Sequence, residues 1–83
     1  MKIRAKEYHA ITLPDYAENC LAPWRPLPGY PNVMVPDPAI HTARALGRLI
    51  EALVPRVGLT AEEVCAILGD SQPDARFVEE VQP

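Results

Sequence analysis

The sequence predicts a small, mainly α-helical single domain over residues 1–83, with three to four short helices and a proline-rich extended loop at residues 23–36. Eighty-three residues suit one domain and are too few for two. Leu, Ile, Val and Phe form about a quarter of the chain, above the roughly 20% below which chains stay disordered. Several segments combine capping residues with apolar residues at helical spacing. A small α+β domain with an N-terminal strand or hairpin is the alternative.

The N-terminal segment, residues 2–13, is compatible with two structures. Ile3, Ala5 and Ile11 share one parity, as in a half-buried strand, but His9 interrupts the apolar side. A strand needs a second strand to pair with, and the candidate is the short run at residues 32–35. We favour a strand, and a helix through residues 5–11 stays open.

A short helix is expected to begin at Thr12. The Thr12 side chain can accept from a free amide of the first turn, where Pro14 is tolerated and Asp15 lies near the positive end of the helix. Pro23 ends this helix.

Proline is unusually frequent, with ten in the chain, and seven of them fall between Pro14 and Pro38. Within residues 23–36, fixed φ angles and missing N–H donors disfavour both a helix and a central strand, which predicts a stiff, extended segment. The segment is nevertheless apolar and aromatic. Large rings usually pack in small cores, so we expect Trp24 and Tyr30 to cover the helices. If the loop is exposed instead, Trp24, Arg25, Leu27 and Tyr30 are the protein-binding candidates.

The principal helix is predicted from Pro38 to Val54. Asp37 and Pro38 form a start signal, and apolar residues then recur at steps of three and four. Gly47 leaves a flat spot on this helix, where another backbone can approach closely.

Two shorter helices are predicted after it. Thr60 and Glu63 have the spacing of a capping box, and Gly69 supplies a left-handed stop. Residues 71–74 repeat a start signal for a last helix, which would carry Phe77, Val78 and Val81.

Residues 25–31 resemble the ligands of SH3 domains, in which a basic residue precedes two prolines on a polyproline helix. Arg25 matches the basic position, Leu27 the apolar position, and Pro28 and Pro31 the two prolines. The resemblance implies recognition by a protein with an aromatic groove.

Residues 58–69 resemble the first helix and turn of excisionase-type and MerR-type helix-turn-helix domains, whose next helix reads the major groove of DNA. The resemblance implies a DNA-binding regulator that uses the helices after Leu59. From Thr60 onward, however, Arg76 is the only basic side chain among six acidic ones, and such a stretch repels phosphates. We therefore expect no nucleic-acid partner.

Metal, cofactor and catalytic sites are not predicted. The soft metal ligands His9, His41, Cys20 and Cys65 do not have the spacing of a zinc site. Ser71 is the only serine and serves as a helix cap, so no nucleophile and base can be paired.

We therefore expect a non-enzymatic protein-binding module, an adaptor or inhibitor that docks on a larger protein. The two cysteines, the lack of a signal-like start and the lack of a long apolar run predict a cytoplasmic protein with free thiols and no membrane contact. Abundant Arg, Ala and Pro suggest a GC-rich bacterial or phage gene, or one on a mobile element. A thin core at this size also makes a homodimer a candidate assembly.

Overall fold

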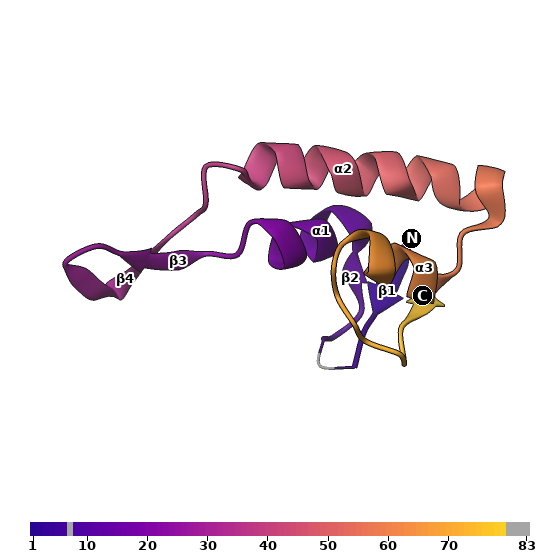
Figure 1. Cartoon of the computed structure of the whole chain (residues 1–83), viewed down its shortest axis with the longest axis horizontal. Helices are drawn as coiled ribbons and strands as arrows, with labels where there is room; N and C mark the ends of the chain where they lie inside the picture. Colours follow the sequence, from indigo (N-terminus) through magenta and orange to yellow (C-terminus); the bar gives the residue numbers. More distant parts are fainter. Residues whose placement is uncertain (7, 80–83) are drawn as a thin grey trace, which may run out of the picture.

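The computed structural model describes residues 1–6 and 8–79 of the chain, which form an α+β domain (Figure 1). The prediction of a mainly α fold is wrong, because the described residues hold five strands in two antiparallel sheets beside three helices. The α+β alternative describes the structure. The difference comes from residues 25–35 and 76–78, two stretches that form strands where a loop and a helix were expected.

A three-stranded antiparallel sheet joins the two ends of the described chain. Strand β1 (Lys2–Arg4) lies between β2 (Ile11–Thr12) and β5 (Arg76–Val78). Ile3 is opposite Ile11 on one side and Phe77 on the other, and all three side chains contribute to the core. The preference for a strand near the N-terminus is confirmed at Lys2–Arg4, but its partners are β2 and β5 rather than residues 32–35.

The predicted last helix is wrong in the described part of the chain. Residues 71–75 form no helix and Phe77 and Val78 lie in β5, while Val81 falls outside the described residues. Pairing with β1 places Phe77 directly opposite the fully buried Ile3. This long-range contact overrides the local start signal at residues 71–74, as tertiary packing commonly overrides propensity.

Helix α1 (Leu13–Leu21) begins as predicted, since the Thr12 hydroxyl accepts from the Asp15 amide at 3.3 Å. Helix α2 (Ile40–Leu53) begins two residues after the predicted Pro38, and the Asp37 carboxylate accepts from the Ala39 amide at 2.8 Å just before it. A π-helical turn, η1 (Val54–Gly58), continues α2. Pro55 has no N–H to donate to the carbonyl four residues earlier, as the α-helix requires, which explains why the helical winding changes there.

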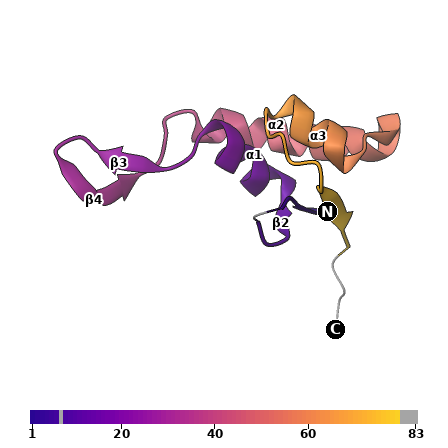
Figure 2. The ribbon, with the colours of Figure 1, turned by 60° about the horizontal axis from the view of Figure 1, so that its bottom comes forward.

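Gly47 is buried where α2 crosses α1, and the two helices lie side by side in Figures 1 and 2. A Cβ at this position would lie 2.6 Å from both the Leu13 carbonyl oxygen and the Pro14 Cα. The prediction that another backbone approaches closely at Gly47 is confirmed. Glycine here allows helix contact at a distance that any side chain prevents.

Helix α3 (Ala61–Ile67) has the predicted capping box. The Glu63 amide donates to the Thr60 hydroxyl at 3.1 Å, and the Thr60 amide donates to the Glu63 carboxylate at 3.0 Å. Gly69 follows with φ +79°, the expected left-handed stop.

The core lies between the inner face of the sheet and the three helices. Its largest fully buried side chains are Tyr16, Ile3, Leu13, Val64 and Cys65. The Tyr16 hydroxyl donates to the Asp70 carboxylate at 2.5 Å and also contacts Cys65 Sγ at 2.9 Å, which ties α1 to α3 and to the loop after it. We call the unit formed by α1, α2, η1, α3 and the three-stranded sheet the body.

The molecule is long for its size, with extents of 44 × 27 × 26 Å and a radius of gyration of 13.8 Å. A compact chain of this length is expected near 12 Å. The excess comes from the strands β3 and β4, which project from one end of the body in Figures 1 and 2. In the described part of the chain, no helix has both the length and the apolar character required to cross a bilayer.

Candidate functional site

The projecting segment, residues 23–36, is a two-stranded hairpin that we call the arm. Strand β3 (Arg25–Leu27) pairs with β4 (Tyr30–Val35) in antiparallel fashion. Pro28 and Gly29 connect them, and Gly29 has φ +84°. The order Pro-Gly with a positive φ at the glycine is typical of a type II turn. The segment is extended as predicted, but it folds back on itself.

The arm carries an irregularity that follows from its prolines. Leu27 is opposite Tyr30 whereas Pro26 is opposite Met34, so residues 31–33 have no partner on β3. Pro26 and Pro31 both lack an N–H, which removes a ladder donor from each strand. These features disfavour the pairing of further strands along the arm.

No residue of the arm is buried. Trp24 is 52% exposed and Tyr30 63%, and Val33 and Met34 of β4 are exposed to a similar degree. The expectation that Trp24 and Tyr30 cover the helices is therefore wrong. The helices bury their apolar faces against each other and against the sheet, at the other end of the molecule.

The four predicted contact residues all lie in the arm, in three different settings. Trp24 and Tyr30 present exposed rings, and Leu27 is half-buried beside the turn. Arg25 is exposed and forms an ion pair with Asp37 at the base of the arm. Val33 and Met34, which were not among the predicted contact residues, lie next to each other in β4 and so point to opposite faces of the hairpin, and both are exposed because neither face is covered.

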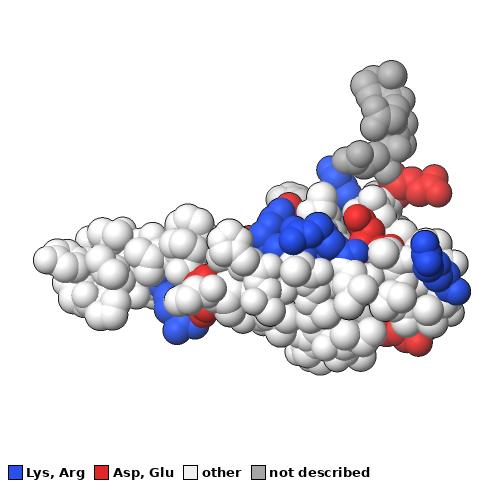
Figure 3. All heavy atoms as spheres, turned by 90° about the horizontal axis from the view of Figure 1, so that it is seen from above, with Lys and Arg blue, Asp and Glu red and all other residues white. Residues whose placement is uncertain are grey.

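Charge is absent from most of the arm. Residues 26–36 contain no Asp, Glu, Lys or Arg. In Figure 3 the arm accordingly appears as a white projection with coloured side chains near its base, while further charged side chains lie in groups over the visible face of the body. An exposed, uncharged and apolar projection of this kind is typical of a protein-binding surface.

The structure does not present the polyproline ligand that the SH3 resemblance implies. Arg25 and Leu27 lie in β3, whereas Pro31 lies in β4 after the turn. The positive φ of Gly29 interrupts the left-handed helix that such a ligand requires. Pro28 and Pro31 therefore do not lie on one continuous polyproline face.

The helix pair expected for a helix-turn-helix domain is not formed in residues 59–79. Helix α3 is followed by β5, with no helix between them. The described part of the chain thus lacks a second helix to place in the major groove.

The thiols and carboxylates do not form a reactive centre. Burial raises the pKa of Cys20 to about 11, and burial also raises the pKa of Cys65, so both thiols stay protonated near neutral pH. Burial, followed by the hydrogen bond to Asp70, raises the pKa of the Tyr16 hydroxyl far above its ordinary value. Among the residues that the structure describes, no three His, Cys, Asp or Glu side chains are grouped to hold a metal ion.

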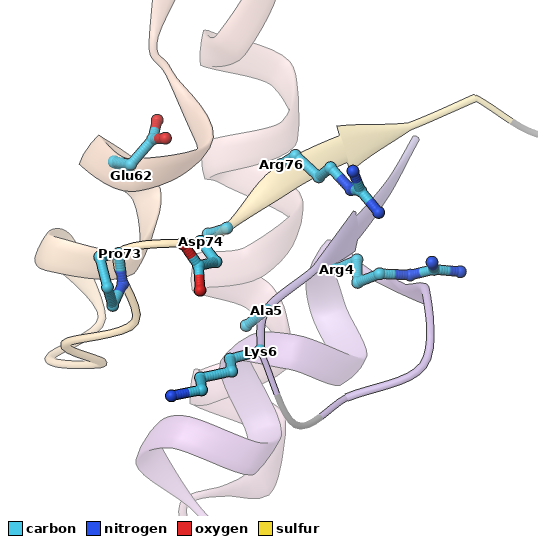
Figure 4. A pocket seen from close by; sticks show the side chains of 8 residues that line it. Arg4, Ala5, Lys6, Glu62, Pro73, Asp74 and Arg76 are labelled. Atoms are coloured by element: carbon cyan, nitrogen blue, oxygen red, sulfur yellow. The ribbon is translucent and has the colours of Figure 1, made fainter.

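A shallow depression of about 570 Å³ lies on the body between the end of β1, the start of β5 and α3 (Figure 4). Arg4, Lys6 and Arg76 line it together with Glu62 and Asp74, and sequence analysis had given none of these a site role. Arg4 is directly opposite Arg76 in the sheet, and in Figure 4 both side chains extend to the same side. Three cations and two carboxylates spread along an open rim provide no convergent set of catalytic groups.

Comparisons of the chain with family models, with curated proteins and with solved structures found no match.

Proposed function

We propose that this chain is a non-enzymatic protein-binding module that docks on a larger protein through the arm and acts there as an adaptor or inhibitor. The observation that supports this proposal is the exposure of Trp24 and Tyr30 on a projection that contributes no buried residue to the body. Aromatic side chains bury large areas and are enriched among the residues that dominate binding energies. Their exposure in water is unfavourable unless a partner covers them.

The form of the arm indicates how it binds. Pro26, Pro31 and the unpaired residues 31–33 disfavour backbone pairing with a partner strand. Binding therefore relies on side chains, with the hairpin inserted into an apolar cleft of the partner. The uncharged stretch from Pro26 to Pro36 suits such a cleft, because no charge has to be desolvated.

A first test measures the exposure of Trp24, which is the single tryptophan of the chain. We expect red-shifted fluorescence and ready quenching by acrylamide in the free protein. A blue-shifted emission that resists the quencher would mean that the ring is covered, and the proposal would lose its main support.

The second test uses photo-crosslinking at the arm in the source cell. A photoreactive phenylalanine analogue at Tyr30 should capture one specific protein, and the same analogue at Ile67, an exposed position on α3, should not. The double variant Trp24→Ser/Tyr30→Ser should lose the captured protein in affinity purification, while Ile67→Ser retains it. Equal capture from both positions would contradict docking through the arm.

The DNA-binding alternative predicts a different result. A helix-turn-helix regulator would bind duplex DNA with an affinity that falls steeply as salt is raised. We expect no salt-dependent binding in fluorescence anisotropy with a labelled duplex. Steeply salt-dependent binding would replace the protein-binding proposal with the regulator.

A further inference from the structure

Helix α2 has a second apolar face, which the fold does not use. Ala43, Gly47 and Ile50 face the core, whereas Leu49 is 55% exposed and Leu53 is 37% exposed. Thr42, Ala45 and Ala52 are also exposed, and Leu46 is half-buried at the margin. We call residues 42, 45, 46, 49, 52 and 53 the outer face of α2.

The outer face has the spacing of a helix-packing seam. Its residues recur at steps of three and four over about three turns, which places them along one side of the helix. They include no charged residue, and Arg44, Arg48 and Glu51 project from the other flank. Arg44 is engaged with Asp15 and Glu18 of α1, away from this face.

From this pattern we infer that the outer face of α2 is a homodimer interface, in which two copies of the chain pack their α2 helices antiparallel about a two-fold axis at Leu49. A two-fold interface requires a patch that is complementary to itself. With the axis at Leu49, Leu49 meets its own copy, Ala45 is opposite Leu53, and Leu46 is opposite Ala52. On either side of the central Leu49 pair, a leucine then faces an alanine, an alternation of large and small side chains that favours close helix packing.

The area of the face is that of a small interface. A helix of 14 residues is about 21 Å long. With η1 extending it, the outer face offers on the order of 500 Å² per copy, at the low end for specific interfaces. An interface of this size suits a weak dimer whose population depends on concentration. Val57 of η1 is 65% exposed and adds apolar area at each end of the seam.

This inference is independent of the proposed function, because the arm and the outer face are separate surfaces. The arm leaves the body at the N-terminal end of α2 (Figure 1). Antiparallel pairing therefore places the two arms at opposite ends of the dimer, free to engage two partner molecules.

The first experiment is sedimentation equilibrium of the full chain over a concentration series. We expect a monomer–dimer equilibrium that Leu49→Glu weakens at least 10-fold, while Arg48→Glu, on the other flank of the same helix, leaves it unchanged. Circular dichroism should show that both variants keep the native helix content, since both positions are exposed. A chain that stays monomeric into the millimolar range would overturn the inference.

The second experiment locates the axis by cysteine cross-linking. Leu49→Cys should form a disulfide-linked dimer under mild oxidation, because the two copies of this residue face each other. Ala66→Cys, at an exposed position on α3, and the parent chain with its native Cys20 and Cys65 should not. If the Trp24→Ser/Tyr30→Ser variant abolishes association and Leu49→Glu does not, the dimer forms through the arm and the inference fails.

Discussion

The body and the arm use apolar residues in opposite ways. The body hides Ile3, Leu13 and Tyr16 completely, between a sheet and three helices. The arm is also rich in large apolar side chains, yet it leaves Trp24 and Tyr30 more than half exposed. Apolar content alone therefore does not mark a core residue. What separates the regions is whether a segment meets a second layer of structure that can cover it.

The sharpest test of this comparison is a matched pair of truncations. Ile3→Ala should lower the free energy of unfolding by about 3 kcal/mol, because a fully buried side chain leaves a cavity. Met34→Ala, in the exposed β4, should change it by less than about 0.5 kcal/mol. Urea denaturation of both variants measures the difference. Similar losses for the two would show that the arm contributes to the core.

Gly47→Ala tests the close contact between α1 and α2. The added methyl group would overlap backbone atoms of Leu13 and Pro14, and overpacking of this kind destabilises by about 1–3 kcal/mol despite the better helix propensity of alanine. The thermal unfolding midpoint of this variant should fall clearly. Ala45→Gly, on the outer face of the same helix, should lower stability by only about 1 kcal/mol. A more stable Gly47→Ala protein would show that the helices are further apart than the structure places them.

Tyr16→Phe tests the polar contact inside the body. The change removes the hydrogen bond to the Asp70 carboxylate, and bonds to charged groups contribute about 1.5–3 kcal/mol. We expect a loss of about 2 kcal/mol in urea denaturation. Tyr30→Phe, in the arm, should leave stability unchanged and so provides the control.

The smallest effect concerns Asp15, at the surface of the body. A hydrogen bond from Arg44 lowers the pKa of the Asp15 carboxyl below its ordinary value. The folded state therefore favours the charged form, and this stability is present above about pH 4 and disappears as pH falls through the lowered pKa. Asp15→Asn should lose less than about 1 kcal/mol at pH 7, since the pair is partly exposed, and nothing at pH 2. A stability difference that persists at pH 2 would contradict the ion pair as its source.

Local sequence signals predicted the starts of α1, α2 and α3 well and the long-range pairings badly. Thr12, Thr60 and Glu63 cap as expected because a cap involves atoms within three residues of one another. The strand at residues 76–78 was missed because its stabilising partner, Ile3, lies more than seventy positions away. The same limit applies to the candidate site. Sequence reasoning selected Trp24, Arg25, Leu27 and Tyr30 by residue type, but their exposure depends on how the helices pack elsewhere.

Asp37 joins the two regions with a single carboxylate. One of its oxygens accepts from the Ala39 amide at the start of α2, and the other binds Arg25 of β3. At the junction of the arm and the body, the Asp37 side chain therefore contacts both the hairpin and the residue that precedes the longest helix. The position of the hairpin is thereby linked to the start of α2 on one side, while the chain at Pro23 links it to the end of α1 on the other.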